Sequence, residues 1–301
     1  MYLAESIAFA FKESFKWSNI KFALINGFLV TILWVFIGYF VWDYLMGISS
    51  FFVEIFPFSM IRANGAWILS SIIFFQLILI TFAIIMVFFG EFYLKKNKEK
   101  YTLYTIATFI GSAIFWAIVW FFKGSYLYNE ILKILMWFPF QTIEKGLAFF
   151  ISFYLIYNAI IVTLLVTTSI FSEKIILNSF DASEVNTKNQ FASILYTLRD
   201  GVIFFVASLA LFVVLFIPVV NILVQILLWV WLIRDTVTVD ALYLNYGELR
   251  KDIKRAHRKA SFVISFMASL FNFLPIIYFF SPLFAEIAMF KYFKSVKENE
   301  K

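Results

Sequence analysis

The chain has 301 residues, of which 63% are hydrophobic, 22% aromatic and only 15% charged, and its mean hydropathy is +0.89. A soluble domain does not have this composition, so the sequence predicts an all-α polytopic membrane protein with one domain, residues 1–301. Cysteine is absent and His257 is the single histidine, which excludes disulfides and zinc clusters of these residues. We therefore expect no metal and no other cofactor.

Residues 1–21 are predicted to form an amphipathic helix on the membrane surface, because charged residues alternate there with apolar ones. The segment does not have the pattern of a cleaved signal peptide. At its end, Ser18 or Asn19 is expected to cap the first span and to leave free N–H groups beside Lys21. Free N–H groups next to a cation form an anion site, so these three residues are candidates for substrate binding. Such junctions are also common wherever a helix enters a membrane.

Four uninterrupted apolar segments, each 19 to 26 residues long, are predicted to cross the bilayer: 22–47, 67–90, 104–122 and 147–171. Two later stretches, 201–246 and 261–290, are interrupted by Pro218 and Pro275. Their unbroken arms of 14 to 17 residues are too short for a hydrocarbon core about 30 Å thick. We therefore expect two proline-tipped re-entrant hairpins, the usual pointer to a substrate path, and a cytoplasmic tail at 291–301.

Positive charge is unevenly distributed along the chain. Of the 25 lysines and arginines, 20 lie in alternate hydrophilic segments, which include the N-terminal segment and the C-terminal tail. Cytoplasmic loops collect positive charge, so this distribution predicts a topology with both termini inside. It also assigns the net charge of +6 to the membrane surface and not to a nucleic-acid partner. The basic segment 247–259 either binds anionic lipid or collects anions, or is an ordinary positive-inside loop.

Polar side chains within the two hairpins are candidates for lining a hydrophilic path, because such groups are costly in a membrane. The candidates are Asn221, Gln225, Arg234, Asp235, Ser261, Ser265, Ser269, Asn272 and Glu286. The four from Ser261 to Asn272 share one helical face. Glu286 lies off that face and would need a cation such as Arg234 or Arg199 beside it to tolerate an anion. Alternatively, the serines and asparagines make helix–helix contacts and the charged residues form structural ion pairs.

Three stretches resemble the CysZ sulfate-permease family of bacterial inner-membrane proteins, part of the etoposide-induced-protein-like superfamily. They are the junction 18–22, the segment 216–235 with its Ile-Pro-Val-Val-Asn tip, and the segment 270–289 with its Asn-Phe-Leu-Pro tip. The resemblance covers 5–50 and 147–293, and 67–122 would be an inserted helical pair. It implies two long spans, two hairpins, a homo-oligomer and sulfate uptake through a multi-pass inner-membrane protein. Of the family's Gly-x-Arg-Arg anion turn, only Lys21 carries over, with Ser18 and Asn19 as capping donors.

The leading functional hypothesis is a permease for sulfate or a related small inorganic anion. Because no ATP-binding motif is present, it would act as a passive pore or an ion-coupled carrier. The alternative is a non-transporting membrane scaffold of the same superfamily, which the missing arginine pair favours. An enzyme is not expected, because nothing places Asp235, Asp240 or Glu286 near a nucleophile or a metal.

Overall fold

The structure is a computed structural model that describes residues 2–55, 58–96, 100–137, 143–181, 185–186, 190–211, 214 and 220–299. Within these residues every regular element is a helix. The elements are α1 (Tyr2–Ser14), α2 (Trp17–Ile55), α3 (Phe58–Lys96), α4 (Tyr101–Trp137), α5 (Ile143–Ile170), α6 (Ser172–Leu177), α7 (Gln190–Ala210), α8 (Val220–Tyr246), α9 (Lys251–Ala256), α10 (Arg258–Phe271), the 3₁₀ helix η3 (Ile277–Phe280) and α11 (Ser281–Asn299).

Among the described residues, five helices are long and apolar enough to cross a membrane. They are Trp17–Phe51, Leu103–Glu130, Ala148–Ile170, Phe191–Ala210 and Val220–Tyr246, and a shorter apolar stretch, Ser70–Met86, lies in α3. This confirms the prediction of an all-α, multi-pass membrane protein. The depth of the hairpins and the number of spans stay predictions.

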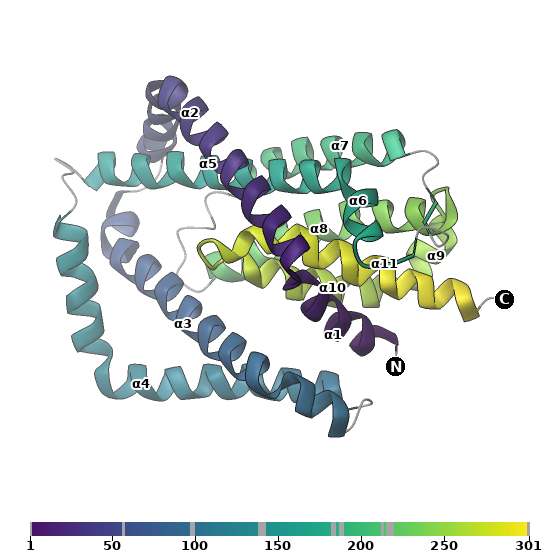
Figure 1. The fold of residues 1–301 in the computed structure, drawn as a ribbon. Helices are drawn as coiled ribbons and strands as arrows, with labels where there is room; N and C mark the ends of the chain where they lie inside the picture. Colours follow the sequence, from purple (N-terminus) through teal and green to yellow (C-terminus); the bar gives the residue numbers. More distant parts are fainter. Residues whose placement is uncertain are drawn as a thin grey trace.

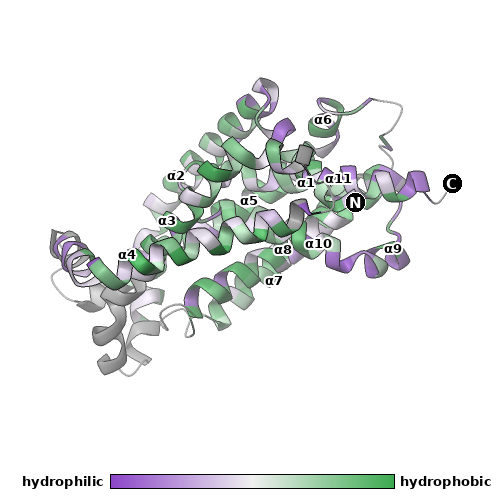
Figure 2. Cartoon of the chain, turned by 90° about the horizontal axis from the view of Figure 1, so that it is seen from below, coloured by the Kyte–Doolittle hydropathy of each residue, from purple (hydrophilic) through white to green (hydrophobic). Residues whose placement is uncertain are grey.

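Helix α8 lies at the centre of the bundle, and α5, α7, α10 and α11 pack around it (Figure 1). Of the residues in its apolar window, 67% are buried, compared with 17% in α2 and 11% in α4. Large apolar side chains along α2 and α4 are therefore exposed, as expected of surfaces that contact lipid. Helices α3 and α4 pack mainly against each other at the side of the bundle (Figure 1). Hydrophilic residues gather at α9 and at the C-terminal end of α11 (Figure 2).

The N-terminal junction differs from the prediction by several residues. Helix α1 ends at Ser14, and α2 begins at Trp17, so the surface helix is shorter and the first span starts earlier. The reason is local: the carbonyl oxygen of Lys16 accepts the N–H groups of Asn19 and Ile20, each at 2.9 Å, which starts the new helix before Lys21. Helix α1 then packs along α11 (Figure 1), and the hydroxyl of Tyr2 donates to Oδ1 of Asn299 at 3.1 Å.

The two hairpins differ in how closely they match the expectation. In the first, α7 has 21 residues and α8 has 27, so both arms are longer than predicted and long enough to span. The predicted stretch 201–246 and α8 end at the same residue, Tyr246, but α8 forms one helix of 27 residues that passes Asp240 inside the bundle, whereas the uninterrupted arms were expected to have only 14 to 17. The break at Pro218 lies outside the described residues. In the second hairpin, α10 has the expected 14 residues.

The tip of the second hairpin is a tight turn that other helices hold in place. Ile276 has φ of +68°, and the N–H of Ile277 donates to the carbonyl of Pro275 at 2.7 Å, which forms a γ-turn of the rare positive-φ kind. Helix α2 crosses the tip closely, because a Cβ at Gly27 would lie 2.2 Å from the ring of Phe279. The chain therefore reverses between α10 and α11 in a fixed position against α2.

Candidate functional site: a basic pocket at the base of the hairpins

A reversal of the chain after α8 builds one wall of the candidate site. Gly247 has φ of +77°, and its N–H donates to the carbonyl of Tyr243 at 2.8 Å, which ends α8 with a left-handed cap. A Cβ here would lie 2.4 Å from the amide nitrogen of Asn186, so only glycine has both the conformation and the space. The chain then turns back, and α9, held by the buried Ile253, brings its basic side chains against α7, α8 and α10.

A pocket of about 430 Å³ lies between α7, α8, α9 and the start of α10. It is lined by Tyr196, Arg199, Arg234, Asp235, Thr238, Leu249, Lys251, Lys254, Arg255, Arg258 and Ser261. Six of these side chains are cationic and one, Asp235, is acidic, so the lining has a formal charge of +5. Clustered charge of one sign in a concave surface raises the local concentration of oppositely charged ions.

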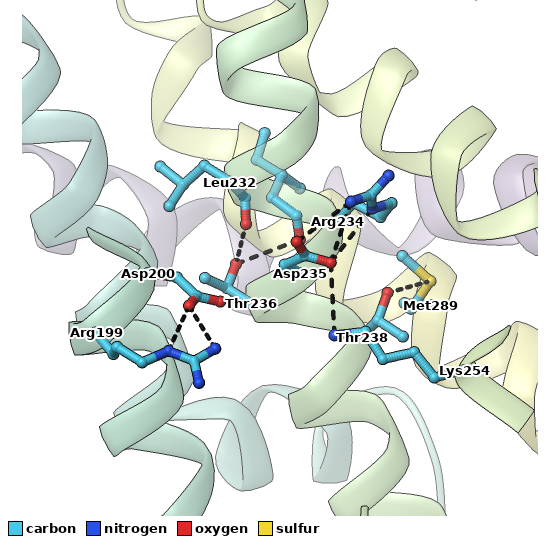
Figure 3. Close-up of polar contacts among 10 residues, drawn as sticks. Arg199, Asp200, Leu232, Arg234, Asp235, Thr236, Thr238, Lys254 and Met289 are labelled. Atoms are coloured by element: carbon cyan, nitrogen blue, oxygen red, sulfur yellow. Dashed lines mark hydrogen bonds and ion pairs between the residues drawn. The ribbon is translucent and has the colours of Figure 1, made fainter. Parts of the chain in front are cut away.

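Part of this charge is paired and part is free to act on a ligand. Arg234 and Lys254 both contact Asp235, with nitrogen–oxygen distances of 3.2 and 3.5 Å (Figure 3). Arg199 pairs with Asp200 at 2.7 Å and stacks on Tyr196, with the guanidinium carbon 4.8 Å from the ring centre. The remaining cations, Lys251, Arg255 and Arg258, form no ion pair with any residue that the structure describes.

The one acidic residue of α9 does not reduce the charge of the pocket. Asp252 accepts two hydrogen bonds from the guanidinium of Arg250, at 3.1 and 2.6 Å. These hydrogen bonds lower the pKa of the Asp252 carboxyl to about 2, so it stays ionised and paired with Arg250. Neither residue lines the pocket. Within the lining the cations are therefore balanced by Asp235, and Arg199 is also paired with Asp200, which does not line the pocket.

The chemistry of the lining suits a small oxyanion. Guanidinium groups present several donors in a plane and bind two oxygens of one anion at once. Ser261 adds a hydroxyl at the inner wall; its side chain is buried and its Oγ has no described hydrogen-bond partner. The positions of Arg234, Asp235 and Lys254 in Figure 3 show a single carboxylate between two cations at the side of α8. An anion that enters the pocket would compete with that carboxylate.

The structure places the N-terminal candidates apart from this pocket. Ser18 and Lys21 are exposed, and neither lines the pocket. Asn19 is buried, but its amide donates to the carbonyl of Glu13 at 2.8 Å and does not cap α2. The prediction left the first N–H groups of α2 free to bind an anion. Two of them donate to the Lys16 carbonyl instead, so the junction offers fewer donors than expected.

Three of the predicted pore-lining residues, Arg234, Asp235 and Ser261, come together in the pocket. The rest of the serine face points into packed protein: Ser265, Ser269 and Asn272 are buried, and Ser269 donates to the carbonyl of Phe266 at 2.8 Å. The Ser269 bond stays within α10, and Oγ of Ser265 and the side-chain amide of Asn272 have no described hydrogen-bond partner, so this part of the face is closed to solvent without hydrogen bonds from these side chains to another helix.

Asn221 and Gln225 do not reach the pocket either. The side chain of Asn221 accepts the N–H of Ile222 at 2.7 Å at the start of α8. Gln225 accepts a hydrogen bond from Tyr154 at 2.6 Å and donates to Asn158 at 3.3 Å. Asn158 also accepts the indole N–H of Trp229 at 3.0 Å, so these side chains form a buried polar network that joins α5 to α8.

Glu286 does not have the cationic neighbour that the prediction required. Arg199 and Arg234 pair with the aspartates that follow them in sequence, which agrees with structural ion pairing for these two. Glu286 is completely buried, and neither of its carboxylate oxygens has a described hydrogen-bond partner. Its charged neighbour is another acid, Asp240.

Sequence reasoning identified the basic segment 247–259 but did not assign its residues to a site. The missed lining residues are Tyr196, Thr238, Leu249, Lys251, Lys254, Arg255 and Arg258. The sequence did contain one signal for this site, which is Gly247. It stands between a long apolar helix and a charge-dense stretch, and a glycine in this place commonly ends the helix and reverses the chain.

Comparison of the chain with protein-family models, curated protein sequences and solved structures gives no significant match. The apolar helices establish an integral membrane protein that contacts the lipid bilayer. The function is therefore inferred from the pocket and its surroundings.

Proposed function

We propose that the protein is a permease for sulfate or a related small oxyanion, and that the basic pocket is its cytoplasmic mouth. The observation that carries this proposal is the lining itself: six cations and one carboxylate around a volume of about 430 Å³. A hydrated tetrahedral oxyanion fits such a volume, and a divalent one would neutralise part of an excess charge that is costly at the edge of a membrane.

The position of the pocket supports a role in permeation. Its lining comes from both hairpins, because Arg199 and Arg234 belong to the first and Ser261 to the second. The resemblance to the CysZ family, which takes up sulfate through an assembly with two such hairpins, supports sulfate as the anion. Under this proposal the protein is a divergent member with α3 and α4 inserted, resides in a bacterial inner membrane with both termini inside, and forms a homo-oligomer.

Arg258 and Lys259 provide a matched test of the pocket. Both are exposed cations on consecutive positions of α10, but Arg258 lines the pocket and Lys259 does not. Purified protein should bind sulfate in calorimetry, and proteoliposomes should take up labelled sulfate. Arg258→Gln should weaken sulfate binding about fivefold, whereas Lys259→Gln should change it by less than about twofold, because solvent screens charges outside the pocket. Absence of sulfate binding by the folded wild-type protein would overturn the proposal.

A membrane scaffold is the second candidate, and the closed serine face favours it. Ser265 and Ser269 are buried, and Ser281 donates to the carbonyl of Ala268 at 2.8 Å, so α10 and α11 are joined along the face that a path would need. A protein that binds sulfate in the pocket but gives no uptake above protein-free liposomes would support the scaffold and refute the permease.

A further inference from the structure

We propose that a polyphosphate, a chain of two or more phosphate groups, binds the basic pocket more tightly than sulfate does and holds together the helices α7, α8, α9 and α10 that line it. The recognised group is the phosphate chain, either free or as part of a nucleotide. Binding is a property of the pocket and does not depend on the proposed function. The consequence for transport, which is inhibition, rests on the proposed function.

The charge of the lining exceeds the charge of one sulfate ion. Six cations and one carboxylate give the lining a charge of +5, and Asp200, which pairs with Arg199 from outside the lining, lowers the excess to +4. A sulfate ion, with its two negative charges, neutralises half of this excess. A triphosphate carries about four negative charges at neutral pH, since a terminal phosphate alone carries about −1.5 to −2. The charge of a triphosphate therefore matches that of the pocket.

The arginines offer more donors than one tetrahedral anion accepts. Arg255 and Arg258 form no ion pair with a described residue, and a guanidinium binds two oxygens of an anion at once. These two arginines alone can therefore bind all four oxygens of sulfate. Arg199 and Arg234 add further donors, because each uses Nε and Nη2 on the aspartate that follows it, whereas its Nη1 donates to no described residue (Figure 3). A chain of phosphates supplies oxygens for these additional donors.

The volume of the pocket fits an anion larger than sulfate. A volume of about 430 Å³ lies within the range of about 300–1,000 Å³ that is typical of pockets for organic ligands. The unpaired cations follow one another along the chain: Lys251 and Arg255 are one helical turn apart on α9, and Arg258 follows at the start of α10. Tyr196 and Leu249 add apolar surface to the lining. The pocket thus provides cations for successive phosphates and a surface that a nucleoside can contact.

A bound polyphosphate would join the two hairpins. Lys254 and Asp235, 3.5 Å apart, form the described ion pair between α9 and α8. A phosphate chain that contacts Arg199 of α7 and Arg258 of α10 at the same time adds a second connection across the pocket. Transport requires α10 to move, because its serine face is closed in this arrangement. A ligand that binds this arrangement better than an open one shifts the population towards it, so polyphosphate should inhibit uptake.

The first test is calorimetric titration of the purified protein with sulfate, inorganic triphosphate and ATP, in EDTA so that no divalent metal competes for the phosphates. Triphosphate should have a Kd about 25-fold lower than that of sulfate, because each of two further charges is expected to lower the Kd about fivefold at partly exposed cations. A Kd for ATP equal to or above that of triphosphate identifies the free phosphate chain as the ligand, and a lower one identifies a nucleotide. A Kd for triphosphate no lower than that for sulfate would overturn the proposal.

Lys251 and Lys259 give a matched pair of variants. Both are exposed lysines of the same basic segment, but Lys251 lines the pocket and Lys259 does not. Neither forms an ion pair with a described residue, so both variants should fold. Lys251→Gln should raise the Kd for triphosphate about fivefold, and Lys259→Gln should raise it by less than about twofold. Equal effects of the two substitutions would show general attraction by a basic surface and would overturn the proposal.

Uptake of labelled sulfate by proteoliposomes tests the consequence for transport. Triphosphate is placed on both sides of the membrane, so that protein in either orientation meets it. It should inhibit uptake by the wild-type protein, and Lys251→Gln should need a concentration about fivefold higher for the same inhibition. Uptake that saturating triphosphate leaves unchanged would overturn the inhibition. Tight triphosphate binding without sulfate binding or uptake would refute the permease and leave the polyphosphate site, whereas sulfate binding without a preference for triphosphate would do the reverse.

Discussion

The pocket makes a prediction whose sign depends on the charge that is removed. Asp235 is the one acidic residue of the lining, and it contacts both Arg234 and Lys254. Asp235→Asn should therefore strengthen sulfate binding, because it removes a repulsive charge and releases two cations. Arg234→Gln should weaken it. The side chains of Arg234, Asp235 and Lys254 are 17%, 21% and 32% exposed, so water can solvate the groups that each substitution leaves unpaired.

The size of both effects follows from Coulomb's law. At about 6 Å and an effective dielectric constant of about 20 to 80, two unit charges interact with about 0.7 to 3 kcal/mol. Solvent screening at partly exposed side chains brings the expected change to about 1 kcal/mol, which is roughly a fivefold change in Kd. The Debye length is about 8 Å at physiological ionic strength, so both effects should shrink as salt is added.

The assay is calorimetric titration of each purified variant with sulfate at two ionic strengths. Glu248→Gln is the control, because Glu248 is an exposed acid near Asp235 in sequence that does not line the pocket, and its Kd should stay within about twofold of wild type. Unfolding midpoints should show that every variant is folded. Shifts of the same sign for Asp235→Asn and Arg234→Gln, or no shift for either, would refute the assignment of the pocket as an anion site.

Three other substitutions test the fold and the limits of the site. Gly27→Ala forces a Cβ into an aromatic ring of the hairpin tip and should lower the free energy of unfolding by about 1–3 kcal/mol. Gly47→Ala is the control on the same helix, because a Cβ there meets no atom within 4 Å, and it should not lower this free energy. Equal unfolding curves for the two variants would contradict the close crossing. Asn158→Leu leaves the indole N–H of Trp229 without an acceptor and should cost about 1–3 kcal/mol in the same measurement, and a stabilised variant would count against the network. Lys21→Ala should change the Kd for sulfate by less than about twofold in calorimetry, and a loss comparable to that of Arg234→Gln would move the anion site to the N-terminal junction.

The sequence predicts the helices better than it predicts their ends. Long apolar runs identify α2 and α5 because the cost of exposing backbone groups to lipid leaves few alternatives to a helix. The uninterrupted length of α8 could not be predicted in the same way. Charged residues such as Arg234 and Asp240 normally mark the edge of a span, but here α8 passes them because neighbouring helices bury Asp240, and Arg234 pairs with Asp235 of the same helix.

Sequence patterns determine only part of this pocket. The periodicity of α8 gives the face on which Arg234 and Asp235 lie, but not the element that packs against that face. That element is α9, and its position depends on the left-handed conformation of Gly247 and on the fit of this residue against Asn186, which lies far away in sequence. From the sequence alone, the charge-dense segment 247–259 is therefore interpreted as a loop, because the helices that pack against it are not known.

The second hairpin determines whether the pocket can be the mouth of a path. Its tip is bound on three sides: Gln76 of α3 donates to the carbonyl of Phe273 at 2.9 Å, Tyr157 of α5 donates to that of Asn272, and the hydroxyls of Thr31 and Tyr278 meet at 3.0 Å. Below the tip, the serine face is buried, so an anion in the pocket meets packed protein beyond Ser261. Permeation therefore requires α10 and α11 to move away from α8. Each hydrogen bond at the tip contributes about 1 kcal/mol, so releasing all three costs about as much as binding one well-coordinated anion can supply. An anion that binds the pocket more tightly in the open arrangement would provide that free energy. A scaffold does not require this movement of α10 and α11.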